Sequence, residues 1–334
     1  MSLRDTLVRP LGNLRLSVTD RCNLRCAYCM PEEEYVWLRS PDVLSFEELS
    51  ALVDRFMALG VRRVRLTGGE PLVRRELHVL VKLLAAKGLD ELTLTTNGVL
   101  LADQAAALRK AGLHRVTVSL DTLRPERFRA LTRRDQLADV LAGIEASRFP
   151  GQLKLDTVVM RGVNDDELLD LVEFARAKNA ELRFIEYMDV GGATRWSPAQ
   201  VVPAREILSV VGPAEPLGAR GAAPAERFRL ASGQIIGVIG STTQPFCRAC
   251  DRARLTADGQ LFTCLYATRG LDLKHLLRAA TPAAELERAI AQTWAQRADR
   301  GAEERLALRE ARGPMLSAAE LRERPHLEMH TRGG

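Results

Sequence analysis

Up to about residue 190, short β-type runs alternate with amphipathic segments of helical period, and this alternation limits the possible folds more than any other feature. The expected strands cover 14–19, 61–66, 92–96, 115–120, 153–160 and 182–187. The expected helices cover 46–59, 73–87, 103–111, 137–147 and 167–178, and Ser45 and Glu48 have capping-box spacing before the first. Six strands alternating with helices favour parallel β/α units. A closed barrel needs eight, so the expected fold class is α/β, an open, partial (β/α)6 TIM-type barrel.

A change in composition marks the end of this alternation. Residues 212–225 are rich in Pro, Gly and Ala, which predicts a barrel domain over 1–215 and a smaller C-terminal domain over 216–334. Beyond the boundary, strand-like runs cover 227–230, 235–239, 254–257 and 260–264, and residues 272–310 are helical in pattern. Asp258-Gly259 between the last two runs indicates a hairpin.

Composition excludes several classes of protein. Hydrophobic residues make up 46% of the chain and charged residues 27%, which is typical of a folded protein. We expect no membrane span and no secretory signal, because no apolar run approaches about 20 residues. The net charge of +5 is compatible with a nucleic-acid-binding protein. Aromatic residues are only 5% of the chain, however, and do not alternate with Lys/Arg blocks as a base-stacking surface would need. We therefore expect a cytoplasmic protein that binds neither membrane nor nucleic acid.

Six cysteines in such a protein are expected to serve as ligands, since the cytosol keeps thiols reduced. The first three, Cys22, Cys26 and Cys29, form C-x3-C-x2-C directly after the first expected strand. A structural zinc site needs four ligands, and no fourth Cys or His lies nearby. Three thiolates suit a 4Fe–4S cluster with one iron left open. This spacing, with Tyr28 before the third cysteine, resembles the signature of the radical S-adenosylmethionine superfamily.

That resemblance implies further contacts to S-adenosyl-L-methionine. Thr67-Gly68-Gly69-Glu70-Pro71 follows the second expected strand and is similar to the turn that meets the methionine amino group, which implies a role for Gly69. The resemblance also implies contacts from Tyr28, from Ser119 at the end of the fourth expected strand, and from Met188 after the sixth.

The remaining cysteines, Cys247, Cys250 and Cys264, form C-x2-C-x13-C near the other end of the chain. A second iron–sulfur cluster is one interpretation of this group. A zinc site with His275 as the fourth ligand is the alternative that the spacing leaves open.

The whole pattern, from about Gly12 to the C-terminal Gly333-Gly334, resembles the GTP 3',8-cyclase family of molybdenum cofactor biosynthesis. Besides the two cysteine groups, the resemblance rests on Thr95-Thr96-Asn97-Gly98, on residues 160–165 and on residues 244–259. It implies a lyase with two 4Fe–4S clusters that converts GTP to (8S)-3',8-cyclo-7,8-dihydroguanosine 5'-triphosphate by radical chemistry. The substrate-binding residues that it implies are Arg15, Arg65, Thr95, Lys154, Arg183, Arg252 and Arg254. It also gives Gly333 and Gly334 a place in the active site.

The residues support a polyanionic ligand independently. Arg15 and Arg65 lie in expected strands, and Arg252 and Arg254 share one face if the chain is extended there. A triphosphate needs several converging cations. Each of these residues taken singly is equally typical of a solvated surface charge.

Two other functions fit parts of the pattern: a two-cluster radical peptide or protein maturase, and a zinc-stabilised binding module. The family resemblance adds expected partners, namely an electron donor such as flavodoxin or ferredoxin and a downstream cyclic pyranopterin monophosphate synthase. The oligomeric state stays open, with a homodimer as the candidate.

Overall fold

A computed structural model describes residues 3–219 and 221–333 of the chain. Its strands form one sheet in the order β12-β11-β10-β1-β2-β3-β4-β5-β6-β9-β8-β7. The strands are β1 (Asn13–Ser17), β2 (Arg63–Thr67), β3 (Glu91–Thr96), β4 (Arg115–Ser119), β5 (Lys154–Val159), β6 (Glu181–Glu186), β7 (Ala214–Pro216), β8 (Glu226–Leu230), β9 (Ile235–Ile239), β10 (Arg252–Leu255), β11 (Gln260–Phe262) and β12 (Leu271–Asp272).

The middle of this sheet is parallel. β10, β1 to β6 and β9 pair in parallel, and the antiparallel pairs β11–β12 and β8–β7 extend its two edges. Within the described residues no ladder joins β7 to β12, so the sheet curves without closing. The predicted α/β fold class, an open barrel of parallel strands with further C-terminal structure, is confirmed.

The C-terminal strands do not form a sheet of their own. β9 pairs with β6 and β10 pairs with β1, so the runs expected in a smaller domain continue the barrel on both sides. The expected hairpin at Asp258-Gly259 joins β10 to β11. A free strand edge carries unpaired backbone N–H and C=O groups, and β9 and β10 satisfy those of β6 and β1. The division of the chain at residue 215 stays a prediction.

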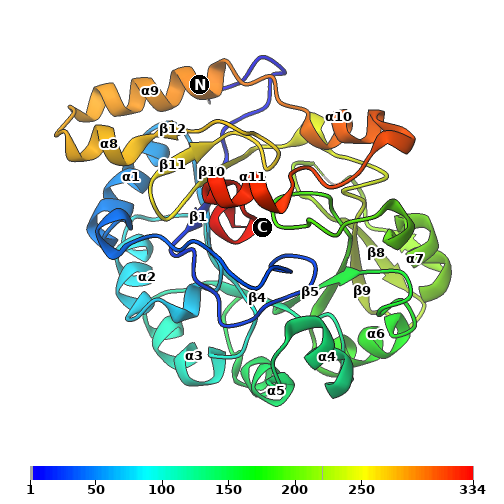
Figure 1. Cartoon of the computed structure of the whole chain (residues 1–334). Coiled ribbons are helices and arrows are strands. Elements are labelled where there is room, and N and C mark those ends of the chain that lie inside the picture. The colour runs from blue at the N-terminus through cyan, green and yellow to red at the C-terminus, as the bar shows by residue number, and fades with distance from the viewer. Residues whose placement is uncertain (1–2, 220, 334) are drawn as a thin grey trace.

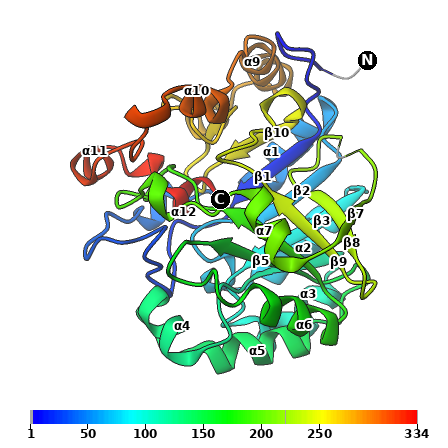
Figure 2. The ribbon, with the colours of Figure 1, turned by 90° about the vertical axis from the view of Figure 1, so that its right-hand side faces the viewer.

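The first seven helices follow one another around the outer side of the sheet (Figure 1). The helices are α1 (Phe46–Ala58), α2 (Leu77–Ala85), α3 (Leu101–Lys110), α4 (Pro125–Thr132), α5 (Leu137–Ala146), α6 (Leu168–Ala177), α7 (Ala204–Val211), α8 (Leu273–Arg278), α9 (Ala283–Ala295), α10 (Gly301–Ala307), α11 (Ala318–Glu323) and α12 (Met329–Arg332). Both views place the C-terminal end of the chain beside the middle of the barrel (Figure 2). In the described part of the chain, no helix is long and apolar enough to cross a bilayer.

The helix boundaries differ from the expected ones in identifiable places. Ser45 and Glu48 form the predicted capping box. The helix expected from residue 73 begins only at Leu77, because a 3-10 turn at Pro71–Val73 and a left-handed Glu76 precede it. The alternation did not show α4, α7, α11 and α12, which are eight residues long or less. Short helices depend on tertiary contacts more than on periodicity.

Alternation along β1 separates the core from the interior of the barrel. Leu14 and Leu16 are fully buried in the main apolar core, with the helices outside them. Since successive side chains of a strand point to opposite faces, Arg15 between them points into the barrel. The same alternation applies to Arg65 between Val64 and Leu66 in β2. The strand pattern therefore directs cations inward.

Candidate active site

The first cysteine triplet lies in the loop after β1. Cys22, Cys26 and Cys29 line one cavity of about 250 Å³ at the C-terminal ends of the strands. The residues that the radical S-adenosylmethionine resemblance implicates all line the same cavity, namely Tyr28, Gly69, Ser119 and Met188. The structure thus brings these seven residues together.

The end of α4 holds this cysteine loop in place. The backbone N–H groups of Arg25 and Ala27 donate to the carbonyls of Thr132 (2.9 Å) and Leu131 (2.8 Å). The Arg25 guanidinium donates to the Cys22 carbonyl at 2.8 Å. These three hydrogen bonds fix the backbone of the loop, and its three thiols are free.

The glycine turn after β2 packs directly on the backbone of the segment before the cysteines. A Cβ at Gly69 would collide with the carbonyls of Arg21 and Asp20, and one at Gly68, whose φ is +148°, would collide with Thr19. The Gly69 N–H donates to the Thr19 carbonyl at 2.9 Å. Only glycine permits this close approach, which forms one wall of the cavity.

Glu70 follows the glycines and is fully buried. Its carboxylate accepts hydrogen bonds from the backbone N–H groups of Leu72 (2.9 Å) and Asn97 (2.6 Å) and from the Thr96 hydroxyl (2.7 Å). Burial outweighs these bonds and raises the pKa of Glu70 to about 7. A cationic ligand in the cavity stabilises the ionised form of such a group.

Asp121 is a second buried carboxylate of this cavity and was not among the site residues expected from the sequence. It accepts a hydrogen bond from the Tyr28 hydroxyl at 2.7 Å and one from the Val158 N–H at 2.8 Å. Burial raises the pKa of Asp121 to about 6. Its position two residues after Ser119, at the end of β4, is the signal that could have identified it.

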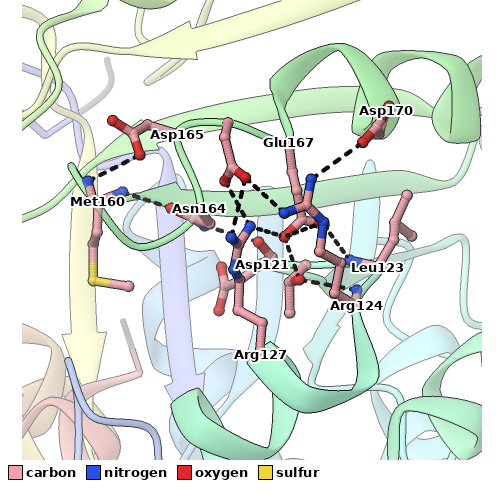
Figure 3. Close-up of polar contacts among 12 residues, drawn as sticks. Asp121, Leu123, Arg124, Arg127, Met160, Asn164, Asp165, Glu167 and Asp170 are labelled. Carbon is pink, nitrogen blue, oxygen red and sulfur yellow. Dashed lines mark hydrogen bonds and ion pairs between the residues drawn. The ribbon is translucent and has the colours of Figure 1, made fainter.

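A polar network holds the loop that carries Asp121 (Figure 3). The Asn164 amide donates to the carbonyls of Asp121 (2.8 Å) and Val158 (2.9 Å). Glu167 accepts from the Thr122 hydroxyl (2.6 Å) and the Leu123 N–H (2.8 Å). Residues 160–165, which matched the family without an assigned role, therefore join the end of β4 to the loop after β5.

The second cysteine triplet lines a different cavity, of about 320 Å³. Cys247, Cys250 and Cys264 share it with all seven residues expected to bind substrate: Arg15, Arg65, Thr95, Lys154, Arg183, Arg252 and Arg254. His275, the candidate zinc ligand, is exposed on α8 and is not among the lining residues. The structure brings the second triplet together with cations and not with His275.

Three of these cations come from neighbouring strands in register. Arg15 lies opposite Arg254 of β10 on one side and opposite Arg65 of β2 on the other. Burial, together with repulsion from Arg254, lowers the pKa of Arg15. Like charges directly opposite each other across a sheet are unfavourable, so the arrangement favours an anion between them.

Only part of this positive charge is balanced by the protein. Arg183 forms a bidentate pair with Asp156 (2.6 and 2.9 Å), and Lys154 pairs with Glu181 (2.7 Å). Among the described residues, no carboxylate forms an ion pair with the remaining cations of the set, Arg15, Arg65, Arg252 and Arg254. Buried unpaired charge is costly, which predicts an anionic ligand in this cavity.

The C-terminal segment reaches both cavities. The Gly333 carbonyl accepts hydrogen bonds from Arg15 (3.3 Å) and Arg254, while Met329 and His330 line the first cavity. Gly333 has a φ of +67°, and a Cβ there would overlap the Thr67 side chain. Gly334 lies outside the described residues.

The two cavities adjoin. They share Thr95, Asp156, Ile185 and Met188 as lining residues. A molecule in one is therefore separated from a molecule in the other by a few side chains only.

The comparisons with known proteins agree with this geometry. Residues 16–175 match the model of the radical SAM superfamily and residues 180–303 that of Molybdenum Cofactor Synthesis C. The chain is 53% identical to GTP 3',8-cyclase 3 of Mycobacterium bovis, over 99% of this chain and 90% of the relative. It is 49% identical to GTP 3',8-cyclase of Acidothermus cellulolyticus, over 90% and 88% of the two chains. The chain belongs to the GTP 3',8-cyclase family.

Solved structures of radical SAM enzymes share the fold of this family member. Streptococcus suis SuiB superposes with a TM-score of 0.62 at 14% identity, covering 87% of this chain and 66% of SuiB. Its S-adenosylmethionine-bound form has a TM-score of 0.58 at 16% identity, covering 85% and 68% of the two chains. This likeness supports the barrel architecture.

Membership of the radical SAM superfamily implies a 4Fe–4S cluster with S-adenosylmethionine, and the first triplet fits that group. Its donors are three cysteines around a cavity, beside a glycine turn in which a Cβ would have no room. Among the described residues, no three His, Cys, Asp or Glu side chains are placed to hold a single metal ion.

The two triplets of this GTP 3',8-cyclase family member differ in their electrostatics. Burial raises the pKa of Cys22 to about 11, with Glu70 adding to the effect. Burial also acts on Cys250, but Arg252 and Arg297 outweigh it and lower the pKa of that thiol to about 6. Burial raises the pKa of the other two thiols of the second triplet, Cys247 and Cys264, so the thiolate is favoured at Cys250 alone among these three.

Proposed function

We propose that this chain is a lyase that converts GTP to (8S)-3',8-cyclo-7,8-dihydroguanosine 5'-triphosphate, in the first step of molybdenum cofactor biosynthesis. The observation that carries the proposal is the cavity of the second triplet. Every expected substrate-binding residue lines it, and it adjoins the cavity of the first triplet. The names of the relatives, which are GTP 3',8-cyclases, support the same substrate.

The proposal includes two 4Fe–4S clusters. Cys22, Cys26 and Cys29 hold the first, and S-adenosylmethionine bound there supplies the radical chemistry. Cys247, Cys250 and Cys264 hold the second. Its support is the set of three free cysteines around one cavity, with the Arg252 guanidinium 3.5 Å from the Cys250 Sγ.

The protein's own part is to bind and orient the nucleotide. Arg15, Arg65 and Arg254 present three cations from adjacent strands, and a triphosphate matches their unpaired charge. Asp156 orients Arg183, and Glu181 orients Lys154, so these two cations are fixed before substrate arrives. Binding energy from the remote triphosphate then holds the ribose beside the first cavity.

Residues of the first cavity position S-adenosylmethionine. In the proposal Gly69 contacts the methionine amino group, Met188 lies at the adenosine, and Tyr28 and Ser119 make further contacts with the molecule. Gly333 and Gly334 belong to the catalytic machinery, supported by the contacts of Gly333 with Arg15 and Arg254.

The proposal also covers partners and location. An electron donor such as flavodoxin or ferredoxin supplies reducing equivalents, and a cyclic pyranopterin monophosphate synthase consumes the product. A cytoplasmic location is supported by the six free cysteines, which need a reducing compartment. A homodimer stays a prediction.

Anaerobic reconstitution with iron and sulfide, followed by S-adenosylmethionine, GTP and dithionite, tests this function. We expect 5'-deoxyadenosine whose formation depends on GTP, together with a cyclised guanosine triphosphate detected by mass spectrometry. Two loaded clusters with no GTP-dependent 5'-deoxyadenosine would contradict the proposal and favour a peptide maturase. Zinc without iron in anaerobically purified protein would favour the binding module.

A further inference from the structure

Three buried arginines from distant parts of the chain hold the backbone of the second triplet. Arg9 donates to the Cys247 carbonyl (2.9 Å), Arg297 to the Cys250 carbonyl (2.8 Å) and Arg332 to the carbonyl of Leu265, next to Cys264 (2.6 Å). Their exposed fractions are 2%, 3% and 1%. We call Arg9, Arg297 and Arg332 the arginine collar.

Carboxylates balance the collar only in part. Asp5 lies 2.6 Å from Arg9 and 3.5 Å from Arg297, and the carboxylate of Asp299 is 3.8 Å from Arg297. Within the described residues, no carboxylate forms an ion pair with Arg332. Two further carboxylates near the second triplet, Asp251 and Glu303, form ion pairs with Arg63 and Arg300, so among the described residues Arg252 and Arg332 have no ion-pair partner.

The collar arginines also carry buried nitrogen atoms that lack a hydrogen-bond partner. One nitrogen each of Arg9, Arg297 and Arg332 is buried without a hydrogen-bond partner. Buried N–H groups are normally satisfied, so these atoms are consistent with an anionic group that completes the site.

The first triplet has the opposite surroundings. Its cavity is lined by Glu70, Asp121, Glu186 and Asp156, of which Asp156 also lines the second cavity and pairs with Arg183, and the described lining residues include no Arg or Lys. Arg25 makes the bond that corresponds to the collar, to the Cys22 carbonyl. The first triplet thus has one arginine in contact with it, Arg25. The second has four, namely the arginine collar and Arg252.

We propose that the arginine collar sets the reduction potential of the second cluster above that of the first. This inference rests on the second cluster of the proposed function. Reduction adds one negative charge to a cluster, and nearby cations favour the added electron while carboxylates oppose it. A one-electron donor therefore fills the second cluster before the first, and the first is reduced only by a donor of lower potential.

Redox titration of the anaerobically reconstituted full-length protein, followed by electron paramagnetic resonance, tests the collar. Addition of S-adenosylmethionine identifies the signal of the first cluster. Arg297→Gln removes one collar charge and leaves Asp5 paired with Arg9. At a fixed applied potential, we expect the ratio of reduced to oxidised second cluster to fall roughly tenfold, which is about 59 mV for one electron.

Three further variants separate charge from structure. Arg297→Lys keeps the charge and is expected to shift the second cluster less than Arg297→Gln. Arg332→Gln changes a different segment of the chain and is also expected to lower the reduction potential of the second cluster. A matching result in both variants excludes misfolding of one variant as the cause. Arg25→Gln is the matched control, because it removes the cation of the first triplet and should move the first cluster only.

The outcomes distinguish the collar from the proposed function. Two clusters with the second reduced at the higher potential, lowered by both glutamine variants of the collar, support the inference. Two clusters in the reverse order, or a second cluster that Arg297→Gln and Arg332→Gln leave unchanged, overturn the collar but not the function. Reconstituted protein with iron for one cluster only overturns both.

Discussion

Each cysteine triplet offers three thiols, but the charged side chains around the two triplets differ in sign. The first is surrounded mainly by carboxylates and the second mainly by arginines. Around Cys22, Cys26 and Cys29, buried carboxylates and a tight glycine turn form a cavity with no lysine or arginine among its described lining residues. Around the second triplet, cations from the strands and the arginine collar dominate. The first surroundings suit a cationic ligand such as a sulfonium and the second a polyanion. The charge around each triplet therefore selects its ligand more than the thiols do.

The largest difference between the two sites is expected when one cysteine is removed from each triplet in turn. We expect Cys26→Ala to reduce cleavage of S-adenosylmethionine to background, with or without GTP, because the first cluster loses a ligand. We expect Cys250→Ala to retain some cleavage but to form no cyclised product. Chromatography of 5'-deoxyadenosine and iron analysis measure both, and iron should fall by about half in each variant. Normal cyclisation by Cys250→Ala would contradict the division of labour.

Removal of a cation from the second cavity should affect one ligand only. Arg254→Ala deletes a buried charge-assisted contact worth about 2 kcal/mol, so the Kd for GTP should rise about thirtyfold. The Kd for S-adenosylmethionine should not change, since Arg254 does not line the first cavity. Calorimetry under anaerobic conditions measures both constants. Arg62→Ala, on an exposed residue beside β2, is the matched control. An equal rise in the Kd for GTP and for S-adenosylmethionine would show that Arg254 does not act on the second cavity alone.

The pH dependence of S-adenosylmethionine binding should report on Glu70. Because burial raises the pKa of Glu70 to about 7, the carboxylate is ionised above that pH and neutral below it. A cationic ligand prefers the ionised form, so affinity should fall by up to about tenfold between pH 8 and pH 6. Equilibrium dialysis of the loaded protein measures this dependence. Glu70→Gln should bind weakly at pH 8 with a flatter profile, and an unchanged slope in this variant would assign the titration elsewhere.

A smaller effect is expected where the tail meets both cavities. Gly333→Ala places a side chain at a φ of +67° against Thr67, which opposes docking by about 1 kcal/mol. Hydrogen exchange in the last ten residues should accelerate about fivefold, and turnover should fall while the Kd for GTP changes little. A Cβ at Gly313 would meet nothing within 4 Å, so Gly313→Ala is the control. Equal exchange in the two variants would separate the tail from the cavities.

Local patterns in the sequence predicted much of the site. Cys22, Cys26 and Cys29 lie close together in the chain, so their spacing alone indicated a shared ligand. Arg15 and Arg65 were expected in strands, and the structure places them in β1 and β2, where they line the second cavity. Gly69 was identified through the resemblance of residues 67–71 to the glycine turn of the superfamily.

Long-range partners could not be predicted in the same way. Arg9, Arg297 and Arg332 are ordinary members of an arginine-rich chain, and their common target becomes visible only when three distant segments meet. The pairing of β9 with β6 and of β10 with β1 was missed for a related reason. Periodicity identifies a strand but not its neighbour, and the composition change near residue 215 suggested a separate unit.

The pairing of β1 with β10 has a consequence for how the protein is made. The Asn13 amide donates to Asp251, which the ribosome adds 238 residues later. Throughout that interval the first strand of the sheet has an open edge, which is a template for pairing with other chains. Arg9 likewise contacts Cys247, which is added 238 residues later, and the collar also needs Arg332, which follows all three cysteines of the second triplet in the chain. The contacts that hold the second cysteine site therefore form only after the segments carrying Arg9, the three cysteines and Arg332 have all been synthesised.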